Sequence, residues 1–531
     1  MTADKICSQF TDAIPLFLSN RDKEIKLEIK PYLQPFERIL ALRELQSLTG
    51  NNVSITEECG FWLVNTDISI ELLRSKLTYW QRIGLSKLEP TLQVALELTQ
   101  NGINQVNERM NLHRARRLRY GPHDLHEYRG KFFPQLVRSL INISGIPKGA
   151  VVLDPMCGSG TTPCEAVAEG MTALGIDLNP LSSLIASVKS SIPMVNAKTF
   201  KNNMTRYLSN FNFSNISPEK IWNKDDLRYL KLWFDPVALD DLASIVSNIN
   251  NLKLSFYRDF FRVCLSNVIR SVSWQKITDL RVRKEITTYD AETAQKLFLD
   301  EVHSQENRIH PYLSVLNHNG ATSLEIRNGN AIDIMSIFYK YHGKVDLIIT
   351  SPPYATALPY LDTDRLSLII LGLLHRKEHG DVEQYMIGTR EISERERLEA
   401  WSSYEERKKE LPCSISSLID KIAKINHGEG IGFRRRNLPA LLGKYFLSML
   451  DVMRSTHKML KPGSSCYYVV GNNSTILNGE KVVIPTDNFL FELGDVAGWN
   501  PTEKIPMELI VSRDVFRGNR GSSESILCFK S

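Results

Sequence analysis

The segment VVLDPMCGSGTT (residues 151–162) decides the fold class of this chain. Its first residues are apolar and β-branched, which predicts a short buried strand that ends at Asp154. The small residues that follow predict a tight turn, because glycines let the backbone turn sharply and approach a ligand closely. TPCE (162–165) then fits a capping box with Pro163 at the first helical position, and Gly170 fits the end of that helix. Strand, turn and helix in this order predict the opening of a parallel α/β sheet.

The strand pattern continues after this segment. Short apolar runs that end at polar or turn residues indicate further buried strands. They are TALGID (172–177), LEIRNGNAIDI (324–334), VDLIITSPPY (345–354), SCYYVVGN (465–472), MELIVSRDVF (507–516) and SILCFKS (525–531). We therefore predict an α/β fold of the doubly wound, Rossmann-like class, in which helices cover a mostly parallel sheet.

The remaining patterns divide the chain into six parts. Apolar residues recur at helical spacing in 30–48, 72–88 and 88–100, which predicts a helical region before the sheet. The predicted parts are a helical accessory domain (1–105), the first part of the α/β core (106–190), a helical insertion (191–323), a further core strand region (324–375), a charged helical insertion (376–445) and the closing strands of the core (446–531).

Composition excludes several classes of protein. The 531 residues are 42% hydrophobic and 24% charged, as in ordinary globular proteins. The net charge of +5 is too small to indicate a nucleic-acid partner by itself. Eight cysteines without a C-x-x-C pair exclude a disulfide scaffold and fit a reducing compartment. The N-terminus lacks the layout of a signal peptide, and the longest apolar stretch (366–374) is shorter than the roughly 20 residues of a membrane span. We expect a cytoplasmic protein with no membrane partner.

The glycine turn indicates a nucleoside ligand that carries a cation. It lacks the lysine of a phosphate loop and the full G-x-G-x-x-G spacing. Asp177 ends the second strand roughly 20 residues after the turn, where an acid suits ribose hydroxyls. Asp154 offers a second acid at the end of the first strand. Together these acids favour S-adenosyl-L-methionine over a dinucleotide. No histidine pair stands at metal-ligand spacing, so no metal site is expected.

DPMCGSGTT (154–162) resembles a cofactor motif of the amino-methylating DNA methyltransferases, usually D-P-F-C-G-S-G-T-T, with Met156 in place of the phenylalanine. HEYRGKFFPQ (126–135) resembles the family's other cofactor motif, H-P-Y-x-A-K-F-x-P, and departs from it at Glu127 and Gly130. GNA (329–331) resembles the family's G-D-A site. The resemblance implies that S-adenosyl-L-methionine is bound by Phe132, Asp154, Pro155, Met156, Cys157, Gly158, Gly160, Thr161, Asp177 and Asn330.

SPPY (351–354) follows the apolar strand 345–350. Its two prolines cannot extend a strand ladder and fix the backbone where the strand ends. A rigid carbonyl beside a side-chain oxygen makes a two-point acceptor for an NH₂ group, and an aromatic ring offers a face for a flat base. The tetrapeptide resembles motif IV of the same family. The resemblance implies direct methyl transfer to an exocyclic amine of a base that has left the duplex, with the catalytic residues Ser351, Pro352, Pro353 and Tyr354.

Within this family, S-P-P-Y is typical of enzymes that act on cytosine N4, and D-P-P-Y of those that act on adenine N6. We therefore expect a site-specific, S-adenosylmethionine-dependent DNA methyltransferase that modifies cytosine N4. The implied partners are double-stranded DNA and a cognate restriction endonuclease. Three alternatives remain open: an adenine-N6 enzyme, an RNA base methyltransferase, and a catalytically silent nucleic-acid-binding subunit.

Two clusters of arginines suit contacts with phosphates. Arg434, Arg435 and Arg436 are flanked by glycines and Phe433, and we expect them to bind nucleic acid. The other cluster consists of Arg114, Arg116, Arg117 and Arg119. A target-recognition element fits three regions, namely the N-terminal domain, 191–323 and 376–445, and the sequence does not choose among them.

Overall fold

The structure is a computed structural model. It describes residues 24–50, 54–58, 60–99, 117–128, 133–276, 283–316, 322–355, 360–389, 392–426, 432–477, 480–507 and 524–531. Phe132, Arg114 and Arg116 lie outside the described residues, as does most of the strand predicted at 507–516.

A seven-stranded sheet forms the centre of the molecule, in the order β13-β14-β10-β9-β6-β7-β8. The five strands from β10 to β8 are parallel, whereas β14 is antiparallel to both of its neighbours. The predicted doubly wound α/β fold is therefore confirmed. The strands are β6 (Val151–Asp154), β7 (Thr172–Asp177), β8 (Leu324–Asn328), β9 (Val345–Thr350), β10 (Leu460–Gly471), β13 (Asn500–Met507) and β14 (Glu524–Lys530).

The direction of strand addition reverses between β6 and β9. The chain passes from β6 outward to β7 and β8, and then returns to place β9 and β10 on the other side of β6. Such a reversal opens a crevice at the carboxyl ends of the strands, and open α/β sheets bind their ligands there. We call this place the switch point.

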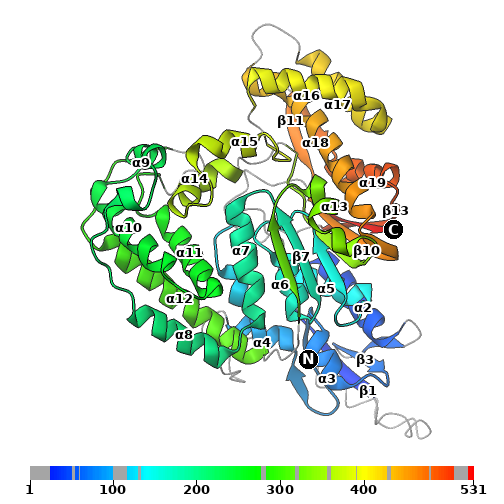
Figure 1. The fold of residues 1–531 in the computed structure, drawn as a ribbon. Coiled ribbons are helices and arrows are strands. Elements are labelled where there is room, and N and C mark those ends of the chain that lie inside the picture. The colour runs from blue at the N-terminus through cyan, green and yellow to red at the C-terminus, as the bar shows by residue number, and fades with distance from the viewer. Residues whose placement is uncertain are drawn as a thin grey trace, which may run out of the picture.

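Helices cover both faces of the sheet (Figure 1). Side chains alternate along a strand, so Leu347 and Ile349 of β9 belong to one apolar core and Ile348 to another. The first core includes residues of α2 (Pro35–Thr49), α5 (Pro134–Ser144) and α6 (Thr161–Ala168). The second core includes residues of α13 (Ile334–Ile337), α18 (Phe433–His457) and α19 (Thr486–Val496).

The chain between β7 and β8 forms a helical lobe, on the left in Figure 1. All the regular elements that the structure describes between residues 192 and 316 are helices, as the pattern predicts. The lobe shares one apolar core with α7 (Pro180–Ser191) and α14 (Tyr360–Ile370), which follow β7 and the SPPY segment. Its helices are α8 (Ala197–Ser209), α9 (Lys224–Leu230), α10 (Pro236–Asn250), α11 (Ser255–Ile269) and α12 (Thr293–Leu316).

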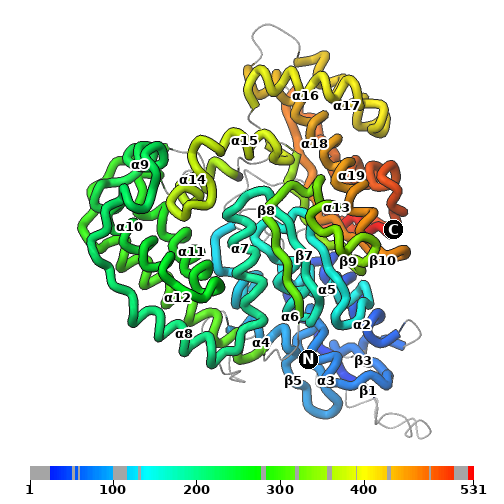
Figure 2. The backbone as a smooth tube through the Cα atoms, viewed as in Figure 1, coloured from blue at the N-terminus to red at the C-terminus, as the bar shows by residue number. Residues whose placement is uncertain are grey.

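A second projection, which we call the arm, lies at the top of Figure 2. It consists of α16 (Glu394–Arg407), α17 (Cys413–Ile425) and the first half of α18, and the short α15 (His379–Glu383) precedes it. Gly443 of α18 lets α16 approach closely, because a Cβ atom there would lie 2.9 Å from the Tyr404 ring. The hairpin β11 (Asn473–Leu477) and β12 (Glu480–Ile484) follows β10.

The prediction of a helical accessory domain at 1–105 was wrong. The described residues before 100 form a five-stranded antiparallel sheet with three helices. The stretch predicted as a helix at 72–88 ends its helix at Lys76 and continues as a strand. Gly84 closes the following hairpin, where a Cβ would lie 1.9 Å from the Lys87 carbonyl oxygen. A short strand that is buried on both faces has no alternation, so its apolar residues also fit a helical period.

This N-terminal domain has the strand order β2-β3-β1-β4-β5. Its elements are β1 (Glu24–Ile29), α2, β2 (Ile55–Glu58), β3 (Phe61–Asn65), α3 (Ile70–Lys76), β4 (Trp80–Gly84), β5 (Leu88–Pro90) and α4 (Leu92–Leu98). Its apolar residues share a core with α5, α6 and one face of the central sheet. The domain therefore packs directly against the strands and helices of the central core.

Candidate active site

The switch point brings two distant motifs into contact. Strands β6 and β9 pair in parallel, so Asp154 and Thr350 end neighbouring strands. The Thr350 hydroxyl donates a hydrogen bond to Asp154 Oδ1 at 2.7 Å. Ser351 follows directly, so the predicted catalytic tetrapeptide begins beside the predicted cofactor turn.

Asp154 is a buried acid with one unsatisfied oxygen. Only 1% of the residue is exposed, and its Oδ1 also accepts a hydrogen bond from the Met156 backbone N–H at 3.1 Å. Its Oδ2 has no hydrogen-bond partner among the described residues. Burial raises the pKa of Asp154 to about 7, against the opposing effect of the Thr350 and Met156 hydrogen bonds. An unpaired buried acceptor of this kind fits a cationic ligand such as the ammonium group of an amino acid.

Two positions in the turn require glycine. Gly158 and Gly160 have φ values of +49° and +79°, in the left-handed region. A Cβ on Gly158 would lie 3.0 Å from the Tyr128 ring, and a Cβ on Gly160 would lie 2.7 Å from the Ala186 Cα. Tyr128 belongs to the other segment that resembles a cofactor motif, so the structure packs the two segments together.

The helix after the turn starts differently from the prediction. Helix α6 begins at Thr161 with Gly160 as its N-cap, and no side chain caps it. The Thr162 hydroxyl instead donates to the Ile349 carbonyl at 3.1 Å. Glu165 points away to His123, so the predicted capping box at 162–165 was wrong. Gly170, with φ +83°, follows the end of the helix as predicted.

Asp177 links the second strand to the turn. Its Oδ2 accepts the Gly158 backbone N–H and its Oδ1 accepts the Asn179 backbone N–H, each at 2.9 Å. Burial raises the pKa of Asp177 to about 6, although these hydrogen bonds lower it. Each carboxylate oxygen can accept a second hydrogen bond. The side chain can therefore hold the turn and still receive ribose hydroxyls.

The other predicted cofactor residues surround the same turn. Asn330 follows β8 and caps a short 3-10 helix through the Ile332 backbone N–H, while the neighbouring Gly329 donates to the Asp177 carbonyl at 3.0 Å. Pro155 and Thr161 are buried, and Met156 is partly exposed. Cys157 is buried, and burial raises its pKa well above the ordinary value, so it stays a neutral thiol.

Sequence reasoning missed Lys189 beneath the turn. Its ammonium donates to the Thr161 hydroxyl at 3.2 Å, and only 1% of the residue is exposed. Burial lowers the pKa of Lys189 to about 8. An isolated lysine in the helix pattern after β7 carries no sequence signal for this position.

The SPPY segment is held by residues from distant parts of the chain. The Tyr354 hydroxyl donates to Glu524 Oε1 at 2.5 Å, and a Cβ on Gly471 would lie 2.9 Å from the Tyr354 ring. Gly388 approaches the Tyr354 carbonyl so closely that a Cβ there would lie 2.8 Å from it. The Asn473 amide donates to the Ala355 carbonyl. Ser351 is half-buried, Pro352 is buried, and Pro353 and Tyr354 are half-buried. Sequence reasoning found none of these partners, because each lies more than 30 residues away from the SPPY segment along the chain.

The basic clusters lie elsewhere. The arginines 434–436 form the exposed first turn of α18, next to Phe433, which is 53% exposed. They belong to the arm and not to the strand ends. Of the described members of the other cluster, Arg117 donates to the Glu97 carbonyl and Arg119 lies 3.6 Å from the Asp124 carboxylate.

The part of the chain that the structure describes has two further properties. No group of three or more histidine, cysteine or acidic side chains there is arranged to hold a metal ion. Among the described helices, none combines the length and the apolar composition needed to cross a bilayer.

This chain is similar to a known methyltransferase family and to known type II methyltransferases. The family model UPF0020, described as an RMKL-like methyltransferase domain, matches residues 125–201, which include the glycine turn. Type II methyltransferase M.MvaI from Kocuria varians is 24% identical over 394 residues, 70% of this chain and 80% of the relative. Type II methyltransferase M.BsoBI from Geobacillus stearothermophilus is 23% identical over 413 residues, 71% of this chain and 79% of the relative.

Among solved structures, TrmN from Thermus thermophilus matches with a TM-score of 0.30 and 11% identity, over 96% of this chain and 99% of the other. The fold class rests instead on the strand order of this chain. The doubly wound sheet and the similarity to type II methyltransferases together support methyltransferase activity for this protein.

Proposed function

We propose that this chain is a site-specific DNA methyltransferase that transfers a methyl group from S-adenosylmethionine to N4 of cytosine. One observation carries the proposal. The hydrogen bond between Thr350 and Asp154 joins the end of the strand before the glycine turn to the end of the strand before SPPY, at the switch point of the sheet. Such a contact lets a methyl donor and an acceptor amine meet over one crevice.

The residues at the switch point fit S-adenosylmethionine. The unsatisfied Oδ2 of Asp154 suits its ammonium group, and the turn at Gly158–Gly160 lets the backbone approach it closely. Asp177 ends β7, Asn330 lies two residues after the end of the neighbouring β8, and the two side chains suit its ribose and adenine. When bound, this cofactor supplies an electrophilic methyl group.

The SPPY segment suits an exocyclic amine. The Ser351 hydroxyl and the Pro352 carbonyl can accept the two N–H bonds of the target, which directs the nitrogen lone pair away from them. The Tyr354 ring, held by Glu524, offers a face on which a flipped base can stack. Attack by the amine needs no protein nucleophile, and the neutral, buried Cys157 is consistent with direct transfer.

Double-stranded DNA is the proposed substrate. Its support is the similarity to type II methyltransferases and the three arginines in the first turn of α18. Positive charges at the amino end of a helix oppose the helix dipole, and a DNA phosphate at this place would offset that cost. A cognate restriction endonuclease as partner and a cytoplasmic location complete the proposal.

Nucleoside mass spectrometry of the host's DNA and RNA tests this function. We would express the wild type, Ser351→Ala and a matched control, Ser336→Ala, in a host that lacks DNA methylation. Ser336 is exposed on α13, and its hydroxyl donates to the Asp333 carbonyl at 2.8 Å. We expect N4-methylcytosine in DNA with the wild type and Ser336→Ala, and none with Ser351→Ala.

The other outcomes separate the alternatives. N6-methyladenine would retain the mechanism and overturn the choice of base. A modified RNA nucleoside would overturn DNA as the substrate. Cofactor binding without any newly modified nucleoside would favour a catalytically silent nucleic-acid-binding subunit.

A further inference from the structure

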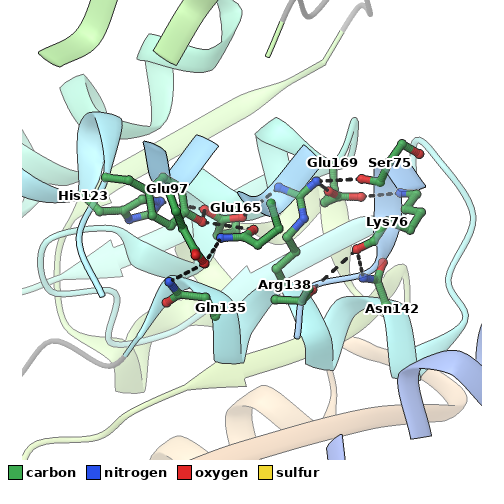
Figure 3. A network of polar contacts seen from close by, with 12 residues as sticks. Ser75, Lys76, Glu97, His123, Gln135, Arg138, Asn142, Glu165 and Glu169 are labelled. Carbon is green, nitrogen blue, oxygen red and sulfur yellow. Dashed lines mark hydrogen bonds and ion pairs between the residues drawn. The ribbon is translucent and has the colours of Figure 1, made fainter. Parts of the chain in front are cut away.

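A buried polar network joins the N-terminal domain to the two helices that follow the predicted cofactor segments (Figure 3). Helix α5 begins within 126–135, the segment that contacts the glycine turn through Tyr128. Helix α6 begins on the turn itself. The network lies behind the turn and contains none of the residues assigned to the reaction.

Arg138 of α5 is the centre of this network. Only 1% of the residue is exposed. Its Nη2 pairs with Glu169 Oε1 and donates to the Ser75 carbonyl at 3.1 Å, and its Nη1 lies 3.7 Å from Glu165 Oε2. One guanidinium therefore contacts both turns of α6, because Glu165 lies inside that helix and Glu169 is its C-cap.

The N-terminal domain supplies the opposing contacts. Lys76, the last residue of α3, pairs with Glu169 Oε2, and 15% of its side chain is exposed. Its carbonyl accepts the Asn142 amide at 2.9 Å. Burial raises the pKa of Glu169, but the charges of Arg138 and Lys76 outweigh burial and hold it below the ordinary value. The carboxylate is therefore ionised and shared between the two cations.

Glu165 holds the middle of α6. Its Oε1 lies 2.6 Å from His123 Nε2 and accepts the Tyr120 hydroxyl at 3.1 Å. Burial raises the pKa of Tyr120 well above the ordinary value, so the phenol keeps its proton and donates. Both residues belong to the segment just before Tyr128, which lies against Gly158.

These contacts determine the orientation of a very short helix. Helix α6 has only eight residues, so a small rotation of it displaces Gly160 and the turn. Removal of one partner from a buried ion pair leaves an uncompensated charge, and the remaining groups must rearrange. Loss of Lys76 leaves Glu169 with Arg138 alone and draws the guanidinium away from Glu165.

We propose that Lys76 and Arg138 are positioning residues through which the N-terminal domain holds the glycine turn in its cofactor-binding shape. The domain thus contributes to cofactor affinity without touching the cofactor. This inference rests on the proposed function, because it takes S-adenosylmethionine as the ligand of the turn.

The test measures binding of S-adenosylhomocysteine by calorimetry to the wild-type full chain and three variants. Lys76→Met removes the charge, and Lys76→Arg restores it. Arg43→Met is the matched control, because Arg43 forms another ion pair of the same domain. That pair joins α2 to Glu503 of β13, at the edge of the sheet farthest from β8. Binding of a DNA duplex and the thermal midpoint are measured in parallel.

We expect Lys76→Met to raise the dissociation constant of S-adenosylhomocysteine about tenfold, because the buried Glu169 carboxylate loses one of its two cationic partners. Lys76→Arg should restore affinity. Arg43→Met should change it by less than about twofold, since exposed pairs contribute little. DNA affinity should stay unchanged in all three variants.

Two results would overturn the inference. One is wild-type affinity in Lys76→Met. The other is an equal loss of S-adenosylhomocysteine affinity in Arg43→Met. That result would mean that any weakened contact between the N-terminal domain and the core lowers the affinity. If the wild type does not bind S-adenosylhomocysteine, the proposed function is wrong, and this inference, which rests on it, is wrong as well. Wild-type binding that Lys76→Met leaves unchanged removes the positioning role alone.

Discussion

Replacement of Asp154 with asparagine should make the unliganded protein more stable than the wild type at about pH 7 to 8 and should weaken its binding of the cofactor. The side chain is buried and its Oδ2 has no hydrogen-bond partner among the described residues. The charged form is therefore poorly solvated until a cation binds. Asparagine keeps the oxygen that accepts from Thr350 and Met156 and removes the charge.

The size of the effect follows from the pKa of Asp154, which burial raises from an ordinary 3.8 to about 7. Between these values the folded protein binds the proton more tightly than the unfolded chain, so stability falls as the pH rises. The slope is about 1.4 kcal/mol per pH unit. From about pH 5 to pH 7 the wild type should lose about 2 kcal/mol relative to Asp154→Asn, because the slope falls as Asp154 of the folded protein ionises near pH 7, and the difference should level off above about pH 7.

Urea denaturation of both proteins without cofactor, at several pH values from about 5 to 8, measures this difference. Asp487→Asn is the control. Burial raises the pKa of Asp487, but hydrogen bonds from Asn488 and Ser525 and the charge of Lys504 outweigh burial and hold it below the ordinary value. Its stabilising effect is lost only at lower pH, so its difference from the wild type should stay constant across this range.

Calorimetry with S-adenosylmethionine completes the test. Removal of one member of a buried charge pair typically costs about 2–5 kcal/mol of binding free energy. Asp154→Asn should therefore bind at least about thirtyfold more weakly while it is the more stable protein at about pH 8. Parallel stability curves for the wild type and Asp154→Asn would refute the electrostatic account, and unchanged affinity would remove Asp154 from the cofactor site.

Three further predictions concern other parts of the molecule. Replacing arginines 434–436 with alanine should weaken DNA binding for all sequences and reduce the slope of log affinity against log salt by about 0.9 for each phosphate that the protein no longer neutralises; Arg395→Ala on α16, 89% exposed at its side chain, should leave the slope unchanged. Gly160→Ala should lower the thermal midpoint and weaken cofactor binding, because its φ is +79° and no space exists for a Cβ. Tyr354→Phe should cost about 1.5–3 kcal/mol of stability in urea denaturation, because Glu524 loses a donor, yet retain more methylation activity than Tyr354→Ala, which also loses the ring.

Local sequence predicted the parts of the site that depend on neighbours in the chain. The strand that ends at Asp154, the glycine turn and the acid at Asp177 are short-range features, and the structure has a strand, a turn and a strand there. The same holds for the strand before Ser351. The alternation of buried strands and helices indicates a parallel α/β sheet, so the doubly wound class was predictable as well.

Local sequence failed where two structures share one apolar pattern. The stretch 72–88 fits one helix by spacing, yet its residues 80–84 form a strand because β1 and β5 lie on their two sides. The capping box at 162–165 failed for a related reason. Thr162 and Glu165 find partners at Ile349 and His123, which outcompete a local cap.

The sequence by itself determined which residues have the chemistry of the site: acids at strand ends, glycines at the turn, and a serine before two prolines. Only the tertiary structure decided how they are held. It set Thr350 against Asp154, Tyr354 against Glu524, and Arg138 between Glu165 and Glu169. The physical reason is that backbone preferences act over a few residues. A buried hydrogen bond or ion pair instead depends on which strands and helices pack together, and that becomes definite only when the whole core has formed.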